Sequence, residues 1–442
     1  MHRYVHTLGS IPAPIETKIL NQHINYYLFS LIMGLRQTSF GYNTVKRTAK
    51  FIKKLKNELG HDKNLMIDSG GYSIIVGDVA YRDTVKCIEC YQYYLDQYAQ
   101  TDADYILSLD IPIFLNEPRG NTANNIYEWN RRSIKESKDC LNRNKDLYNK
   151  FIFVWHFKIT KQFDIWRSIY DEFFRNKEET VVNHAIGGLV GLRSAANINF
   201  SPFLIPLYKV LKIISDNNFD TTSIVHILGV YHKYDRFILS FLSKLINEVY
   251  FKNRNTKIKL TFDTVNYTLT GLYKAREMPM IVTNNNDIMF DYAHNLIDYM
   301  DEIVHDDIAR KEIIEDLYRV KSGHMLNNPK LLSLLMIPYN QYCDYIMTKM
   351  IEEENLLDLF LQTRGPNNFI NQFIKIFNKW NTRYPFVFHG LKHSLCENFR
   401  WVKSAHELWE ADIDEKKWDQ CVKKFANVIN FPHDLGGNFH YD

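Results

Sequence analysis

Short runs of apolar and β-branched residues recur along the first 270 positions of the chain, and polar or small residues follow each run. Asp68, Asp110 and Asp263 each come directly after such a run. The runs are too short for buried helices and rich in Ile, Val, Leu and Phe, which is typical of buried strands. The pattern therefore predicts strands that carry carboxylates on their carboxyl-terminal ends.

The predicted strand ends recur at regular intervals. They fall at positions 68, 110, 156, 187, 229 and 263, with helix-like sequence between them. Such alternation is typical of repeated βα units and a parallel sheet. Two earlier candidates, around Tyr4-Val5 and at Tyr26–Ile32, bring the number of strands to eight. The polar ends come from many strands rather than from one Gly-rich turn, which favours a closed (β/α)8 TIM barrel over an open doubly wound sheet.

The chain is longer than one barrel. It has 442 residues, whereas a barrel of this kind needs roughly 250. After a polar loop, the apolar positions change to a helical i, i+3, i+4 spacing. We therefore predict a barrel domain over residues 1–285 and a mostly helical accessory region over residues 286–442. Segments such as Arg400-Trp401-Val-Lys403 and Lys416-Lys417-Trp418 suit either nucleic-acid binding or packing of this region against the barrel.

Composition favours an ordinary globular protein, with 45% hydrophobic and 24% charged residues. The longest apolar runs are too short to span a bilayer, and the first residues lack the layout of a secretory signal. We expect a cytoplasmic protein with no membrane contact. Six cysteines show no disulfide framework. His389, His393 and Cys396 have a spacing that can place ligands on one helix face, but a fourth ligand is missing, so we expect no metal and no cofactor.

The net charge of +3 neither requires nor excludes a nucleic-acid partner. Two predicted helices nevertheless concentrate basic residues. One carries Lys46, Arg47, Lys50, Lys53, Lys54 and Lys56, and the other carries Arg131, Arg132, Lys135 and Lys138. Each cluster is either a solvated helix face or a set of phosphate contacts around the barrel mouth.

Four strand-end segments resemble the signature segments of one enzyme family. They are Asp68-Ser-Gly-Gly-Tyr72, Ala185-Ile-Gly-Gly-Leu-Val-Gly191, Leu228-Gly-Val230 and Phe262-Asp-Thr-Val265. In this order they resemble the guanine transglycosylases, TIM-barrel enzymes that exchange a guanine in a polynucleotide for a 7-deazaguanine. The similarity covers about residues 60 to 270, and four segments in order at strand ends are a specific signal.

The resemblance implies a role for each of the main residues. Asp263 would attack C1′ and displace guanine, leaving a covalent glycosyl-enzyme, and Asp68 would carry the proton of the leaving and incoming bases. Asp110 would accept hydrogen bonds from the N1–H and N2–H₂ edge of guanine, because a carboxylate only accepts. Gly187 and Gly188 would let the backbone approach O6. The structural alternatives are a turn or cap role for Asp68, closing its glycine loop, and a cap role for Asp263.

The remaining pocket residues follow from the same resemblance. Tyr72 and Leu228 would sandwich the base, although the family often has methionine at the latter position. His156 stands where the family has glutamine, so it either contacts the base or has a packing role. Ser69, Leu189 and Gly229 complete the predicted base-binding set.

The sequence departs from the tRNA enzymes after the nucleophile. They carry a cysteine-rich zinc site there, whereas the next cysteine in this chain is Cys343. This favours the DpdA-type DNA guanine transglycosylases, several of them phage-encoded, which insert 7-deazaguanines such as 7-cyano derivatives into DNA and thereby block restriction. The Asn, Lys, Ile and Tyr usage suggests an AT-rich genome, consistent with a phage protein in the host cytoplasm. Three alternative functions remain open: a tRNA enzyme, a catalytically idle nucleic-acid-binding barrel and a glycoside hydrolase. The protein could also form a homodimer.

Overall fold

A computed structural model describes most of the barrel and the middle part of the carboxyl-terminal region. The residues that it describes are 3–8, 12, 14–31, 41–70, 84–111, 123–156, 160–174, 180–189, 200–217, 221–230, 232–264, 311, 336–411 and 420. The predicted boundary between residues 285 and 286 lies outside these ranges. Among the described helices, none has the length and apolar character needed to cross a membrane.

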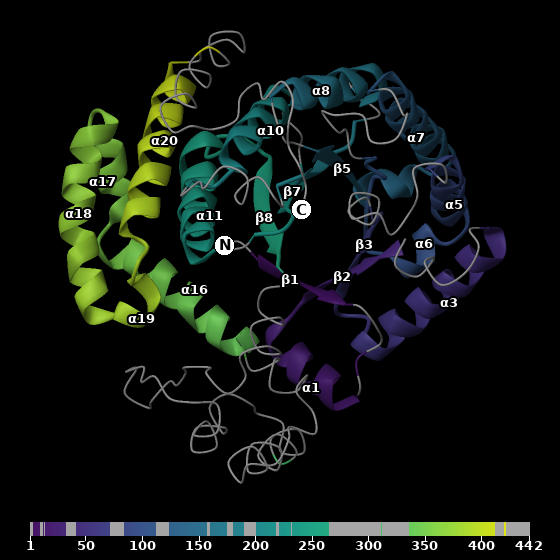
Figure 1. The fold of residues 1–442 in the computed structure, drawn as a ribbon, viewed down its shortest axis with the longest axis horizontal. Coiled ribbons are helices and arrows are strands. Elements are labelled where there is room, and N and C mark those ends of the chain that lie inside the picture. Colours follow the sequence, from purple (N-terminus) through teal and green to yellow (C-terminus); the bar gives the residue numbers. More distant parts are fainter. Residues whose placement is uncertain are drawn as a thin grey trace.

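Eight parallel strands form a closed barrel in sequence order, as the spacing of the apolar runs predicts (Figure 1). Strand β8 pairs with β1, with Val5 opposite Asp263, and this pairing closes the ring. The strands are β1 (Arg3–Leu8), β2 (Tyr26–Ser30), β3 (Asn64–Asp68), β4 (Tyr105–Leu107), β5 (Phe151–His156), β6 (Asn183–Gly187), β7 (Thr222–Ile227) and β8 (Lys257–Asp263). The predicted (β/α)8 barrel is confirmed.

Helices surround the barrel and connect consecutive strands (Figure 1). The described ones are α1 (Pro14–His23), α3 (Tyr42–Leu59), α5 (Thr84–Gln97), α6 (Ala99–Asp102), α7 (Ala123–Arg143), the 3₁₀ turn η2 (Lys145–Asn149), α8 (Thr160–Phe174), α10 (Leu204–Asn217), α11 (Lys233–Leu245) and the π-helical turn η4 (Ile246–Tyr250). Their apolar faces and the outward strand faces form one large core. This layer of helices fixes the strands and therefore the residues at their ends.

The two-residue period of the strands determines which side chains enter the barrel. Mostly aliphatic side chains fill the interior: Val5, Tyr26, Leu28, Met66, Leu107, Ile152, Val154, Ala185 and Ile224. Successive side chains of a strand point to opposite faces, so the residue two positions beyond an interior residue also points inward. By this rule Asp68, His156 and Gly187, which follow Met66, Val154 and Ala185 by two, point inward at the carboxyl-terminal mouth.

Strand β4 is shorter than the sequence predicts. It ends at Leu107, and Asp110 follows in irregular backbone. The Ser108 hydroxyl oxygen accepts the Val154 backbone N–H at 2.9 Å, so this N–H does not pair with a strand carbonyl. The local change lets the chain turn, and Asp110 still reaches the mouth.

The described part of the carboxyl-terminal region, residues 336–411, is mostly helical and packs against α11 on the flank of the barrel (Figure 1). Its described helices are α16 (Met336–Glu353), α17 (Leu356–Gln362), α18 (Pro366–Arg383), α19 (Pro385–Phe388) and α20 (Lys392–Glu410). Trp401 is 2% exposed and packs edge-on against Phe200 and Tyr208 of the barrel. Of the two roles open for the aromatic residues of this region, Trp401 therefore has the packing role. Trp418 lies outside the described residues.

Candidate active site at the barrel mouth

Three aspartates from three different strands converge at the mouth of the barrel. The pKa of Asp68 is raised to about 7, chiefly because the carboxyl group is buried and also because the negative charges of Asp110 and Asp263 lie nearby. The Gly70 backbone N–H and the Ser30 hydroxyl oppose these effects only in part. A carboxyl group with a pKa near neutrality can both donate and accept a proton under physiological conditions.

Asp68 also closes the loop that follows β3. Its Oδ2 accepts the Gly70 backbone N–H at 3.1 Å, and Gly70 has a φ of +88°, which favours glycine. The turn role considered for Asp68 is thus present. The Ser30 hydroxyl lies beside Asp68 in the strand register but forms no full hydrogen bond. The turn contact holds the carboxyl group in place and leaves room for a proton on Oδ1.

Asp110 is held from two sides. The Ser69 hydroxyl donates to its Oδ1 at 3.3 Å, and the His156 Nδ1 lies 2.8 Å from its Oδ2. Because a carboxylate only accepts, we assign the hydrogen of the shorter bond to Nδ1. His156 is 2% exposed, and its Nε2 is buried without a hydrogen-bond partner among the described residues. One ring nitrogen therefore has the structural role, and the other is available to a bound molecule.

Gly187 keeps open the space between Asp110 and Leu228. A Cβ on Gly187 would lie 3.3 Å from the Leu228 Cδ1 and 3.8 Å from the Asp110 Oδ2. Any larger side chain would enter this space. The next residue, Gly188, has a φ of +77°, and Leu189 is buried behind it. Leu228 rests on the apolar barrel interior, so it offers an apolar surface opposite the polar Asp110.

The two carboxylate oxygens of Asp263 have different surroundings. Oδ1 accepts the Gly229 backbone N–H at 2.9 Å, and Gly229 has a φ of +71°. The Thr7 hydroxyl donates to Oδ2 at 3.5 Å, which is the outer limit of a hydrogen bond. Oδ1 is anchored, and Oδ2 is the less restrained oxygen.

His226 is a site residue that the sequence does not reveal. It is fully buried on β7, its Nδ1 lies 2.9 Å from the Thr261 Oγ1, and its Nε2 lies 3.5 Å from the Asp263 Oδ1. The last contact is within ion-pair range but is not a well-formed hydrogen bond. A histidine within an apolar run suggests a core residue. The available signal is its place two residues before Leu228, on the inward face of the strand.

Most of the predicted site residues are brought together at the mouth. They are Asp68, Ser69, Asp110, His156, Gly187, Gly188, Leu189, Leu228, Gly229 and Asp263, all at or just beyond strand ends. Tyr72 lies outside the described residues. His389 precedes α20, so it does not share a helix with His393 and Cys396. Within the described part of the chain, no group of three His, Cys, Asp or Glu residues is placed to hold a metal ion.

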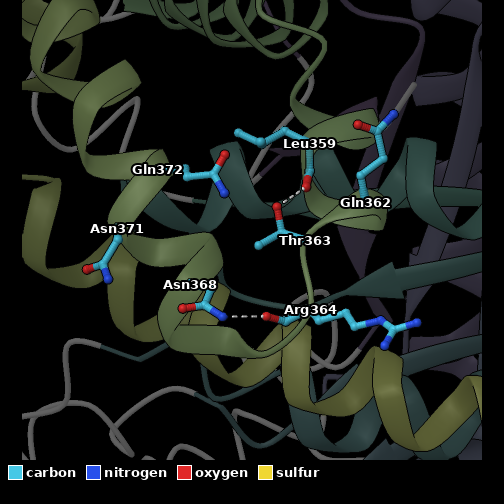
Figure 2. Close-up of a pocket in the computed structure, with 7 residues that line it drawn as sticks. All are labelled: Leu359, Gln362, Thr363, Arg364, Asn368, Asn371 and Gln372. Atoms are coloured by element: carbon cyan, nitrogen blue, oxygen red, sulfur yellow. Dashed lines mark hydrogen bonds between the residues drawn. The ribbon is translucent and has the colours of Figure 1, made fainter.

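A hollow of about 560 Å³ lies between α17 and α18, within the helical region (Figure 2). Its lining includes Arg364 and the amides of Gln362, Asn368, Asn371 and Gln372. The Asn368 amide donates to the Arg364 carbonyl at 3.0 Å, and the Thr363 hydroxyl donates to the Leu359 carbonyl at 2.7 Å. These bonds serve the ends of the two helices. The hollow contains no acid, unlike the barrel mouth.

The mouth combines an acid that can carry a proton, a second acid with one oxygen that is less restrained, and a third that is held by Ser69 and His156. This set suits displacement at an anomeric carbon followed by transfer to a second acceptor. No protein-family model matches the sequence, and the search of curated proteins also finds no match.

Proposed function

We propose that this protein is a guanine transglycosylase, which exchanges guanine in DNA for a 7-deazaguanine base. The observation that carries the proposal is the pairing of Asp68, whose pKa is raised to about 7, with Asp263, whose Oδ2 is almost unrestrained. A double displacement needs one protonated acid and one ionised acid in the same site, because the first transfers a proton and the second attacks. The four segments that resemble the guanine transglycosylases support the same reaction.

In the first half-reaction, Oδ2 of Asp263 attacks C1′ of the target nucleotide. The C1′–N9 bond breaks, its electron pair passes to the guanine, and protonated Asp68 supplies the proton that the leaving base needs. The product is an ester between Asp263 and C1′. The Gly229 N–H and the Nε2 side of His226 hold Oδ1, so Oδ2 faces the sugar.

In the second half-reaction, a 7-deazaguanine replaces guanine in the same pocket. Its N9–H gives the proton back to Asp68, N9 attacks C1′, and the Asp263 carboxylate leaves. Two inversions at C1′ give net retention. The proton and the carboxylate return to their initial states, so the exchange requires neither a metal nor a redox cofactor.

The pocket contacts suit a guanine-like base. Asp110 presents an acceptor to the N1–H and N2–H₂ edge, and adenine lacks this pair of donors. Gly187 leaves a flat space beside Asp110, and Leu228 supplies an apolar face for the ring. Planar recognition of this kind favours a nucleobase over the extended sugar chain of a glycoside hydrolase.

The test is exchange of radiolabelled guanine, and of a labelled 7-deazaguanine, into duplex DNA, single-stranded DNA and unmodified tRNA. We expect incorporation into DNA, and guanine release should decrease above a pH of about 7 as Asp68 loses its proton. Incorporation into tRNA alone would favour the tRNA enzyme. Binding of both polymers without any exchange would favour the idle barrel.

A further inference from the structure

Two helices of the barrel wall, α3 and α7, carry basic clusters of similar size, but the surroundings of the two clusters differ. In α3 the side chains of Lys46, Arg47, Lys50, Lys53 and Lys54 are all exposed to solvent. An α-helix turns by about 100° per residue, so these five positions fall within an arc of about 120° and a length of about 12 Å. They therefore form one continuous stripe, which we call the α3 stripe.

The α3 stripe has no ion-pair partner within the described part of the chain. Lys56, which turns away from it, is the lysine of this helix that pairs with an acid, Asp104. Lys53 lies within electrostatic reach of the partly buried Asp102 but forms no ion pair with it. The helix contains one acid, Glu58, which follows the last lysine of the stripe by one turn. Among the described residues, therefore, no acid is bound to the stripe by an ion pair.

The basic residues of α7 have a different fate. Arg131 pairs with Glu172 of α8, and Arg132 donates to Glu136 at 2.6 Å. Lys135 lies 3.7 Å from Asp139. Arg143 donates to Asp96 of α5 at 2.6 Å, and the buried Lys138 lies over the rings of Tyr148 and Phe174. The cations of α7 are used within the barrel wall, whereas within the described residues those of the α3 stripe form no ion pair.

The α3 stripe begins at the mouth of the barrel. The strands are parallel, and α3 connects the end of β2 to the start of β3, so its first turn lies on the same side as the strand ends (Figure 1). Tyr42, the first residue of the helix, is 56% exposed and lies about 20° beyond the edge of the stripe's arc. Its ring lies 4.7 Å from that of Tyr93, which holds it in position. Asp68 lies at the end of the following strand.

We infer that the α3 stripe binds the phosphate backbone of the DNA whose target nucleotide enters the mouth. The inference rests on the proposed function for the choice of DNA. Duplex DNA carries one phosphate per strand for about every 3.4 Å, so a stripe of about 12 Å faces about three phosphates of one strand. The exposed Tyr42 ring, between the stripe and the mouth, offers a stacking surface for a base next to the target.

The experiment compares two triple variants that remove the same charge. The first is Lys46→Gln, Lys50→Gln and Lys54→Gln on the α3 stripe, and the matched control is Arg131→Gln, Arg132→Gln and Lys135→Gln on α7. Binding of a fluorescent guanine-containing DNA duplex is measured by anisotropy between about 50 and 200 mM salt. Circular dichroism and thermal unfolding confirm that both variants are folded.

We expect DNA binding by the α3 triple variant to depend less steeply on the salt concentration than DNA binding by the wild type. Each phosphate contact contributes about 0.9 to the slope of log K against log salt, so the slope should decrease by about two to three, and binding should weaken roughly tenfold or more at low salt. The α7 triple variant should retain the wild-type slope and bind within about twofold of the wild type.

Equal losses in both variants would overturn the inference, because they would report net charge alone. An unchanged α3 variant would overturn it too, and so would a change seen with tRNA but not with DNA. The assay needs no turnover, so its outcome is separate from that of the proposed function. The two outcomes can therefore differ. If the wild type exchanged no base, and DNA binding by the α3 triple variant still had a shallower salt dependence than that of the wild type, the proposed reaction would be refuted and the role of the α3 stripe supported.

Discussion

Two of the places where the described part of the chain buries carboxylates have opposite surroundings. One place is the barrel mouth, with Asp68, Asp110 and Asp263. The other is the seam between α11 and its neighbours, with Asp235 and Asp344. The two groups differ in whether each acid has a cation or hydrogen-bond donors of its own or faces other acids.

In the seam, each acid has a dedicated partner. Arg236 of α11 lies 3.0 Å from Asp344 of α16. The Ser201 hydroxyl and the His232 backbone N–H both donate to Asp235, at 2.6 and 3.1 Å. Burial still raises the pKa of Asp344 to about 6, although Arg236 and Lys233 oppose this rise. Asp344 thus joins the helical region to the barrel, and these hydrogen bonds of Asp235 hold barrel segments together.

In the mouth, the acids face one another. Among the described residues, no lysine or arginine forms an ion pair with Asp68, Asp110 or Asp263, and their nearest ionisable neighbours are histidines and other acids. Burying like charges together is unfavourable unless one group holds a proton. The mouth therefore stores negative charge that a positively charged sugar transition state would relieve.

The largest effect should come from Asp263→Asn. The amide keeps the shape and removes the attacking oxygen charge, so guanine exchange should decrease by about a thousandfold or more. The contrast with the seam predicts that thermal unfolding changes little, because Asp263 has no cationic partner to lose. The control variant is Asp344→Asn, which should retain guanine exchange. Near wild-type exchange by Asp263→Asn would exclude it as the nucleophile.

The next effect concerns the seam. Arg236→Met leaves Asp344 buried without its cation, and removal of one partner from a buried pair costs about 3–5 kcal/mol of unfolding free energy. Adding Asp344→Leu removes the remaining charge and should recover most of the loss. Urea unfolding of the single and double variants measures both values. If Arg236→Met were as stable as the wild type, the stability of the seam would not depend on the pairing of Asp344 with a cation.

A smaller effect is expected from Asp110→Asn in the mouth. The amide places a donor where guanine also has donors, and a mismatched buried contact costs on the order of 1–3 kcal/mol. Exchange should therefore decrease by roughly tenfold to a hundredfold. Steady-state kinetics with guanine provide the measurement, with Ser69→Ala as a milder control because it removes only the 3.3 Å bond to Asp110. Unchanged kinetics would remove Asp110 from the base pocket.

The comparison also shows which features a sequence can reveal. The strand ends are predictable because the two-residue period places Asp68, His156 and Asp263 on the inward face. The partners of charged side chains cannot be predicted in the same way. Arg131 and Glu172, for example, pair across two different helices, so the basic clusters of α3 and α7 look alike in the sequence. His226 is missed for a related reason, because its buried place beside Asp263 depends on the register between β7 and β8.

The smallest effect is a pH dependence of stability that distinguishes the two regions. The pKa of Asp68 is raised from 3.8 to about 7, so the folded protein keeps a proton that the unfolded chain releases. This contribution to stability is fully present below a pH of about 4 and is lost as the pH rises through about 7. Asp68→Asn lacks this loss and should exceed the wild type in unfolding free energy at pH 8, by on the order of 1–3 kcal/mol after allowance for partial exposure. The matched variant Asp344→Asn should diverge from the wild type nearer pH 6, where its own carboxyl group titrates. Urea unfolding between pH 4 and pH 8 measures both difference curves. Parallel curves for Asp68→Asn and the wild type would show that the mouth does not hold the proton that the first half-reaction requires.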